Sequence, residues 1–166
     1  MTEMKTPRGF TLLHLVLALT AMTTLASVGI PAWFSKESVT LDNAAELLAR
    51  DLRDAQDRAA FQHRSVRVEF DRSGDGYKIV DSHGEPLRAP VGNGDFERVY
   101  SRDAVFRGVI IESVDTGPEH AIHFGARGVA LNGGQLVISF GDERRHMEIE
   151  PTTGDVTVDG EPVSSY

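Results

Sequence analysis

A stretch in the middle of the sequence has the oxygen donors of a possible calcium loop. Asp71, Ser73 and Asp75 stand at its first, third and fifth positions, and Gly76 follows at the sixth. The closing carboxylate of such a loop belongs at the twelfth position, where this chain has Ser82. A hairpin turn therefore explains the stretch better than a calcium site does.

His120 and His123 are the second candidate for metal binding. Positions three apart in a strand face opposite sides of a sheet, and no cysteine or carboxylate cluster with zinc spacing lies nearby. The chain also lacks the sequence of a nucleophile elbow. We therefore expect no metal site, no cofactor and no catalytic residue, and we do not expect an enzyme.

The N-terminal region offers chemistry that would act on the chain itself. Lys5 and Arg8 lie in a short polar leader that ends at Gly9. Residues 10–34 form an uncharged run in which His14 alone can ionise. At 1.5 Å per residue, a helix of this length crosses a hydrocarbon core of roughly 30 Å. Because the basic residues precede the run, we expect a cytoplasmic leader and an exported remainder.

The junction Gly9-Phe10-Thr11-Leu12-Leu13 resembles that of the type IV pilin and type II secretion pseudopilin family. The resemblance implies that a prepilin peptidase cuts between Gly9 and Phe10, that the new amine of Phe10 is N-methylated, and that the apolar helix is kept. An ordinary signal peptide would instead be cut after the apolar run, where Ala26-Ser27-Val28-Gly29 offers a loose site. The length of the run and the position of the junction favour the pilin interpretation.

His14 stands where this family usually has a glutamate. The resemblance implies that the glutamate attracts the N-terminal ammonium of a neighbouring subunit inside the membrane, where an unpaired charge is costly. Neutral histidine cannot supply that attraction, and protonated histidine would repel the ammonium. Some minor pseudopilins at filament tips also lack the acid. His14 therefore indicates either a tip or initiating subunit or a weakened form of the ordinary contact, and both interpretations stay open.

The remaining part of the chain has the composition of one globular domain. Hydrophobic residues make up 40% and charged residues 25% of the sequence, which excludes a disordered chain. There is no cysteine, so an exported domain must rely on its core rather than on disulfides. The formal net charge of -8 gives no support to a polyanionic partner.

Residues 35–62 are expected to continue the helix as an amphipathic segment. Pro31 lies where pilin helices commonly carry a proline, and it either kinks or locally melts the helix or merely ends the span. Beyond it, apolar residues such as Leu41, Leu48 and Leu52 recur with helical spacing on one face. The charged residues of the other faces are interpreted as solvated: Glu46, Arg50, Asp51, Arg53, Asp54, Asp57 and Arg58.

From residue 65 the apolar pattern changes to a period of two, which is typical of half-buried strands. No alternation of strands and helices follows, so the sheet is expected to be mainly antiparallel. Strands are predicted at residues 65–70, 77–80, 105–114, 121–124, 135–140, 144–149 and 156–158, with an irregular loop over residues 84–94.

This order resembles the GspH/FimT group of minor pseudopilins and minor pilins. The likeness rests on the helix end at residues 52–60, the strand at 65–70, the segment 122–128 and the strand at 154–158. It implies an α+β fold in which a long N-terminal helix, membrane-spanning in its first half, packs on a mainly antiparallel two-sheet β domain. The expected divisions are a leader (1–9), a membrane-spanning helix (10–34), its amphipathic continuation (35–62) and the β domain (63–166).

The expected function is that of a structural minor pseudopilin of a type II secretion system, or a minor pilin of a type IV pilus. The implied partners are prepilin peptidase, other subunits of the same filament and inner-membrane lipid. The implied location is the bacterial inner membrane, which the chain crosses once, with the C-terminal domain in the periplasm. The subunit is then extracted into a periplasmic or surface filament.

The sequence also bears on two other functions. The resemblance raises a DNA-receptor function, because some FimT-like minor pilins take up DNA through a basic C-terminal segment. In this chain, residues 146–166 contain no Lys or Arg. Arg144-Arg145 is the only basic pair near this end, so no nucleic-acid partner is expected. A membrane-tethered ligand-binding domain outside any filament would need a pocket, which a sequence does not reveal.

Overall fold

The computed structural model describes the backbone of residues 12–163, and the side chains of these residues outside 24–37. Helix α1 (Leu12–Gln62) continues through Gly29 and Pro31 in its backbone. The chain divides into two units, Met1–Lys36 and Glu37–Tyr166. Among the described residues, no helix contains a stretch long and apolar enough to cross a membrane. The side chains of residues 24–37 lie outside that set, and the span at 10–34 stays a prediction.

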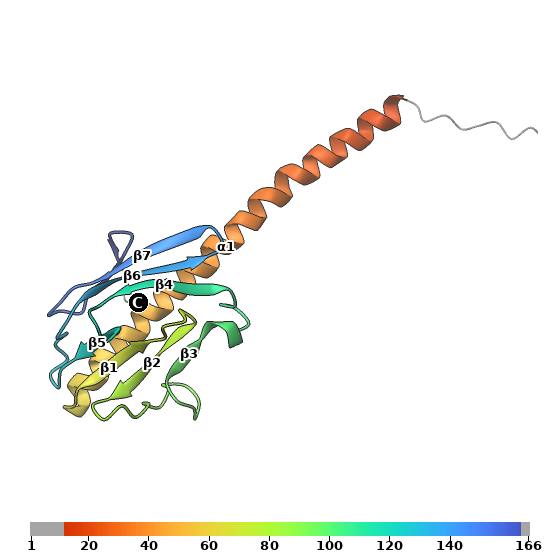
Figure 1. Cartoon of the computed structure of the whole chain (residues 1–166). Coiled ribbons are helices and arrows are strands. Elements are labelled where there is room, and N and C mark those ends of the chain that lie inside the picture. The colour runs from red at the N-terminus through yellow and green to blue at the C-terminus, as the bar shows by residue number, and fades with distance from the viewer. Residues whose placement is uncertain (1–11, 164–166) are drawn as a thin grey trace, which may run out of the picture. The chain divides into compact units, whose positions relative to one another are not determined.

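Within the unit that begins at Glu37, the described strands form two antiparallel sheets (Figure 1). The first sheet has the order β3-β2-β1-β5 and consists of β1 (Val66–Phe70), β2 (Gly76–Asp81), β3 (Glu97–Val99) and β5 (Ala121–Phe124). The second has the order β4-β6-β7-β8-β9 and consists of β4 (Val109–Asp115), β6 (Gly134–Phe140), β7 (Glu143–Ile149), β8 (Val156–Val158) and β9 (Glu161–Pro162).

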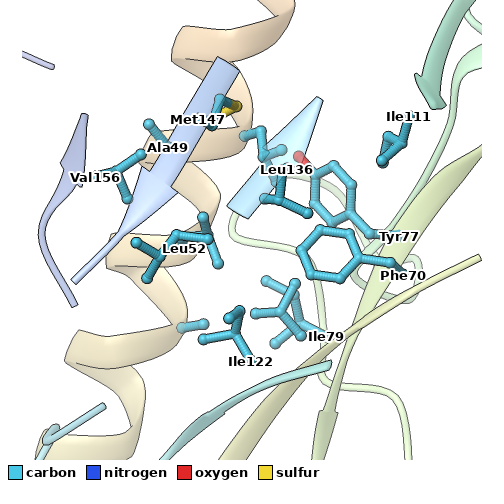
Figure 2. Close-up of a cluster of buried hydrophobic side chains, with 14 of the residues drawn as sticks. Ala49, Leu52, Phe70, Tyr77, Ile79, Ile111, Ile122, Leu136, Met147 and Val156 are labelled. Atoms are coloured by element: carbon cyan, nitrogen blue, oxygen red, sulfur yellow. The ribbon is translucent and has the colours of Figure 1, made fainter. Parts of the chain in front are cut away.

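The C-terminal half of α1 shares one hydrophobic core with both sheets. Leu41, Leu48 and Leu52 are fully buried on one face of the helix, as their helical spacing predicts. In Figure 2, Leu52 lies between Ile122 of the first sheet and Met147 of the second. Burying an aliphatic side chain of this size contributes roughly 1.5–3 kcal/mol to the stability of the fold. The buried leucines of the helix therefore help to hold the two sheets together. The predicted α+β fold is confirmed.

The predicted strand at 105–114 begins too early. Residues 103–108 form a turn instead, in which the Asp103 carboxylate accepts hydrogen bonds from the backbone N–H groups of Val105 (2.7 Å) and Phe106 (3.2 Å). Gly108 then takes a positive φ of 101°, which an extended strand does not allow. Strand β4 therefore starts at Val109. The apolar side chains of this turn resemble a strand in sequence although the backbone does not form one.

The side chain of Asn132 closes the free edge of β5. Its Oδ1 accepts a hydrogen bond from the backbone N–H of His123 (2.8 Å), and its Nδ2 donates to the carbonyls of Ala121 (2.8 Å) and Thr116 (3.0 Å). The backbone N–H of Leu131 donates to the carbonyl of His123 at 2.8 Å. This edge is therefore paired by one short segment rather than left open, which removes a site of edge-to-edge association.

Candidate assembly surface

The described N-terminal part of α1 exposes a row of large apolar side chains. All residues from Leu12 to Thr23 are exposed, and Leu12 and Met22 are 82% and 75% accessible. The other large apolar side chains of the row are Leu13, Leu15, Val16, Leu17 and Leu19. Covering seven such groups is worth on the order of 10 kcal/mol or more. A surface of this kind marks contact with lipid or with other protein chains.

Polar groups on the same helical segment are bonded within the helix. Thr20 Oγ1 donates to the carbonyls of Val16 (3.1 Å) and Leu17 (3.0 Å), and Thr23 Oγ1 donates to the carbonyl of Thr20 (3.0 Å). These hydroxyls therefore do not require water, which suits an apolar environment. His14 is exposed within the same row of leucines.

The predicted processing and assembly residues are described to different extents. Gly9 and Phe10 lie outside the described residues, so the proposed cut between them stays a prediction. Pro31 lies within α1, but its side chain belongs to the part that is not described. The structure places His14 on the exposed part of the helix.

Arg145 fastens the beginning of the packed part of α1 to the second sheet. Its guanidinium donates to Asp42 Oδ1 (2.7 Å) and to Ser38 Oγ (3.0 Å), both on the helix. Carboxylate oxygens of Glu143 (3.4 Å) and Asp159 (3.5 Å) complete its surroundings. The hydrogen bond to Asp42 raises the pKa of Arg145. The Arg145 charge thus has partners on α1, on its own strand β7 and in the turn after β8.

Asp51 fastens the same helix to the first sheet. The expectation that Asp51 lies on a solvated face is wrong, because Asp51 is only 3% exposed. Asp51 Oδ2 accepts hydrogen bonds from Tyr77 Oη on β2 and from Arg98 Nε on β3, both at 2.8 Å. Burial, more than any other cause, raises the pKa of Tyr77 well above its ordinary value. The sheets cover more of the helix than its apolar stripe, so this flanking carboxylate is enclosed.

Two arginines from the same set of charged residues are also packed rather than fully solvated. Arg58 lies over the ring of Phe96 at 5.2 Å from its centre. Arg53 donates a hydrogen bond to the carbonyl of Val163. Their guanidinium groups therefore have an aromatic ring and a backbone carbonyl as partners rather than water alone.

The two stretches considered for metal binding have other partners. Asp71 Oδ1 accepts a hydrogen bond from the backbone N–H of Ser73 (3.0 Å), and Asp75 accepts from the N–H and hydroxyl of Ser101 (2.7 and 2.6 Å). His123 lies 3.0 Å from Glu119. Within the part of the chain that the structure describes, no group of three or more His, Asp or Glu side chains is placed to hold a metal ion.

The sequence matches the family model "Type II transport protein GspH" over residues 44–154. The chain belongs to the GspH family. Two crystal structures of the type IV minor pilin FimU from Pseudomonas aeruginosa strain PAO1 are similar in fold. One is 20% identical with a TM-score of 0.51, covering 75% of this chain and 95% of that chain. The other is 24% identical with a TM-score of 0.48, covering 75% and 90%. No curated protein matches.

Membership of the GspH family rests on the packed domain and not on the N-terminal motif. The match begins at Ala44, so Gly9, Phe10, His14 and Pro31 all lie before it. The family match is therefore independent of the apolar N-terminal part of the helix. This family consists of pilin-like structural subunits.

Sequence reasoning missed the two charged residues that hold the helix most closely. In the sequence, Arg145 stands out only as half of a basic pair. Its spacing of two and four residues from the buried Met147 and Ile149 nevertheless places it on the same inner face of β7. Asp51 is adjacent to the buried Leu52, which was the available signal that it borders the core. Both residues act by holding the C-terminal part of α1 in the GspH domain.

Proposed function

We propose that this GspH-family chain is a minor pseudopilin or minor pilin, a structural subunit of a type II secretion or type IV pilus filament. The observation that carries the proposal is the pairing of a GspH domain with a helix whose residues 12–23 expose their apolar side chains. Such a helix needs a covering of lipid before assembly and of other subunits after it. The family alone supports a filament subunit anchored in the inner membrane, with its domain in the periplasm.

The mechanism that we infer has two stages. Prepilin peptidase removes residues 1–9, and residues 10–34 remain in the membrane, where apolar helices of neighbouring subunits associate. The subunit is then extracted, so that helix–helix contacts in the filament replace helix–lipid contacts of similar apolar character. The β domain forms the outer surface and selects neighbouring subunits. No catalytic step by this chain is required.

N-terminal sequencing of the membrane-bound protein tests the processing step. We expect a mature chain that begins at Phe10 and retains the apolar helix. Gly9→Val should block maturation because a bulky side chain precedes the cut, whereas the matched control Gly9→Ala should still be processed. A mature chain that begins at Val28 or later would contradict the proposal, because it would identify an ordinary signal peptide.

Replacement of His14 distinguishes two possible positions of the subunit in the filament. A tip subunit has no outer neighbour whose ammonium needs a carboxylate, so His14→Glu should leave assembly intact or let the subunit spread along the filament. If His14 is a weakened ordinary contact, the same change should improve incorporation without moving the subunit, since a paired charge avoids desolvation costs of several kcal/mol. Gold labelling of filaments distinguishes them, and even wild-type labelling along the shaft would exclude a tip position.

A DNA-receptor function gains no support from the C-terminal arginines. Arg144 forms a bidentate pair with Glu112 (2.8 and 3.1 Å) and lowers the pKa of that carboxyl. Arg145 is occupied by Asp42 and Ser38. Phosphate contacts by this pair would require both arginines to give up carboxylate partners. An electrophoretic shift of DNA by the purified protein at moderate salt would revive that function.

A further inference from the structure

Two asparagines in this chain are followed directly by glycine, Asn93–Gly94 and Asn132–Gly133. Glycine has no side chain to hinder its backbone nitrogen, so that nitrogen can reach the side-chain amide carbon of the preceding asparagine. We propose that Asn93 is a site of spontaneous covalent modification, by deamidation and isomerisation, and that the fold protects Asn132 from the same reaction. This proposal does not depend on the assembly function.

The reaction needs only the chain and water. The backbone nitrogen of Gly94 forms a bond to Cγ of Asn93, the bond from Cγ to Nδ2 breaks, and ammonia leaves with the proton that the Gly94 nitrogen gives up. Water then opens the resulting imide ring at one of its two carbonyls. The products are aspartate and its isomer, in which the chain continues through the side-chain carbon. Nothing is oxidised or reduced.

Asn93 lies where this attack is sterically free. Gly92, Asn93 and Gly94 are all exposed, and a Cβ placed on Gly94 would meet nothing within 4 Å. One hydrogen bond of the loop at residues 88–95 runs from the Ala89 N–H to the Gly94 carbonyl at 3.0 Å. That bond uses neither the nitrogen that attacks nor the side chain that is attacked. The side chain can therefore rotate toward the Gly94 nitrogen.

Asn132 has the same sequence neighbour in the opposite environment. Its side chain is held by three hydrogen bonds, from His123 and to Ala121 and Thr116. A Cβ on Gly133 would lie 2.4 Å from the carbonyl oxygen of Ile149, so this backbone is enclosed as well. The Asn132 side chain would have to rotate before the Gly133 nitrogen could attack its Cγ, and that rotation would break all three bonds. The reaction there requires prior local opening of the fold.

Modification of Asn93 should leave the rest of the domain intact. The product adds one negative charge, and its isomer lengthens the backbone within the loop between the bridged residues Arg88 and Asp95. This loop touches α1 through the Arg88 carbonyl, which accepts a hydrogen bond from Arg58 at 2.6 Å. Asn93 and Gly94, whose bond is altered, are exposed. Old and newly made molecules would therefore differ chemically at one loop.

The test is incubation of the full chain in mildly alkaline buffer, followed by peptide mapping with mass spectrometry that separates amide, acid and isomer. In the native protein we expect conversion at Asn93 and conversion at Asn132 that is at least about thirtyfold slower, because it waits for local opening. In concentrated denaturant both should react at similar rates. Gly94→Ala should slow conversion at Asn93 at least about tenfold without lowering the melting temperature, because its Cβ enters open space.

Three results would overturn the proposal. Persistence of the Asn93 amide in native protein after Asn132 has begun to react would show that the loop is not the susceptible site. Equal native rates at the two positions, or an Asn132 that stays unreactive in denaturant, would show that the fold is not what protects Asn132. The denaturant arm also confirms that both peptides can be detected, so failure to observe a product is informative.

Discussion

Replacement of Asp51 by alanine is the most direct test of how the first sheet is held to α1. The change removes the acceptor of two 2.8 Å hydrogen bonds, from Tyr77 and from Arg98. Tyr77 is 2% exposed, so its hydroxyl would be left buried without that partner. Removing one partner of a buried ion pair commonly costs 3–5 kcal/mol, but the Arg98 side chain is 37% exposed and can turn toward water. We therefore expect a loss of about 3 kcal/mol.

The variant Tyr77→Phe separates the hydrogen bond from the ion pair. With Asp51 present it should cost about 1.5 kcal/mol, the lower end of the range for a hydrogen bond to a charged group. With Asp51→Ala already made, it should cost nothing or stabilise slightly, because it removes the buried hydroxyl that has lost its acceptor. The two changes should therefore show a coupling of roughly 1.5 kcal/mol or more.

Urea unfolding of the domain, followed by circular dichroism, measures these differences through the transition midpoint at constant slope. Glu46→Ala is the matched control, since Glu46 pairs with Arg50 on the exposed face of the same helix and should change stability by less than about 0.5 kcal/mol. The reasoning is refuted if Asp51→Ala costs no more than the control. It is equally refuted if Tyr77→Phe costs the same in both backgrounds.

Three further outcomes are expected. Asn132→Asp should destabilise by about 2–3 kcal/mol in urea, because a carboxylate cannot donate to the Thr116 and Ala121 carbonyls; an unchanged midpoint would contradict this. Since burial raises the pKa of Tyr77 and Tyr100, the folded state retains protons that the unfolded state releases, so stability should fall above the ordinary tyrosine pKa of 10.0; Tyr77→Phe should flatten that fall in alkaline melting curves. A chain beginning at Lys36 should fold without added metal, and loss of its circular dichroism in chelator would revive the calcium loop.

Local pattern was enough to predict most of the regular structure. The strand at 121–124 and the strand at 156–158 were predicted with the bounds that β5 and β8 have. Strands β3 and β9 were not predicted, because runs of three and two residues are too short to show alternation. The apolar pattern predicts strand at 105–108, where the chain forms a turn, because the Asp103 carboxylate competes with the sheet for backbone N–H groups.

The candidate site was predictable only where it depends on sequence neighbours. The exposed apolar row at residues 12–23 follows from composition alone. By contrast, the partners of Arg145 lie 103 and 107 residues away, at Asp42 and Ser38. The partners of Asp51 lie 26 and 47 residues away. Helical spacing marks which face is apolar, but it does not tell how far around the helix two sheets will extend.

Two ionic contacts that join α1 to the sheets have a consequence for the freedom of the helix to rotate. Asp42 is tied to β7 through Arg145, and Asp51 is tied to β3 through Arg98, so the helix is attached to a different sheet at each of two heights. Nine residues separate these points, which corresponds to about 13 Å along the axis. Apolar packing is not directional, so one such contact would fix the rotation of the helix about its axis against one sheet only. Two contacts in different directions resist rotation of the helix about its axis. They keep the exposed face that carries Glu46 and Arg50 at a constant angle to both sheets.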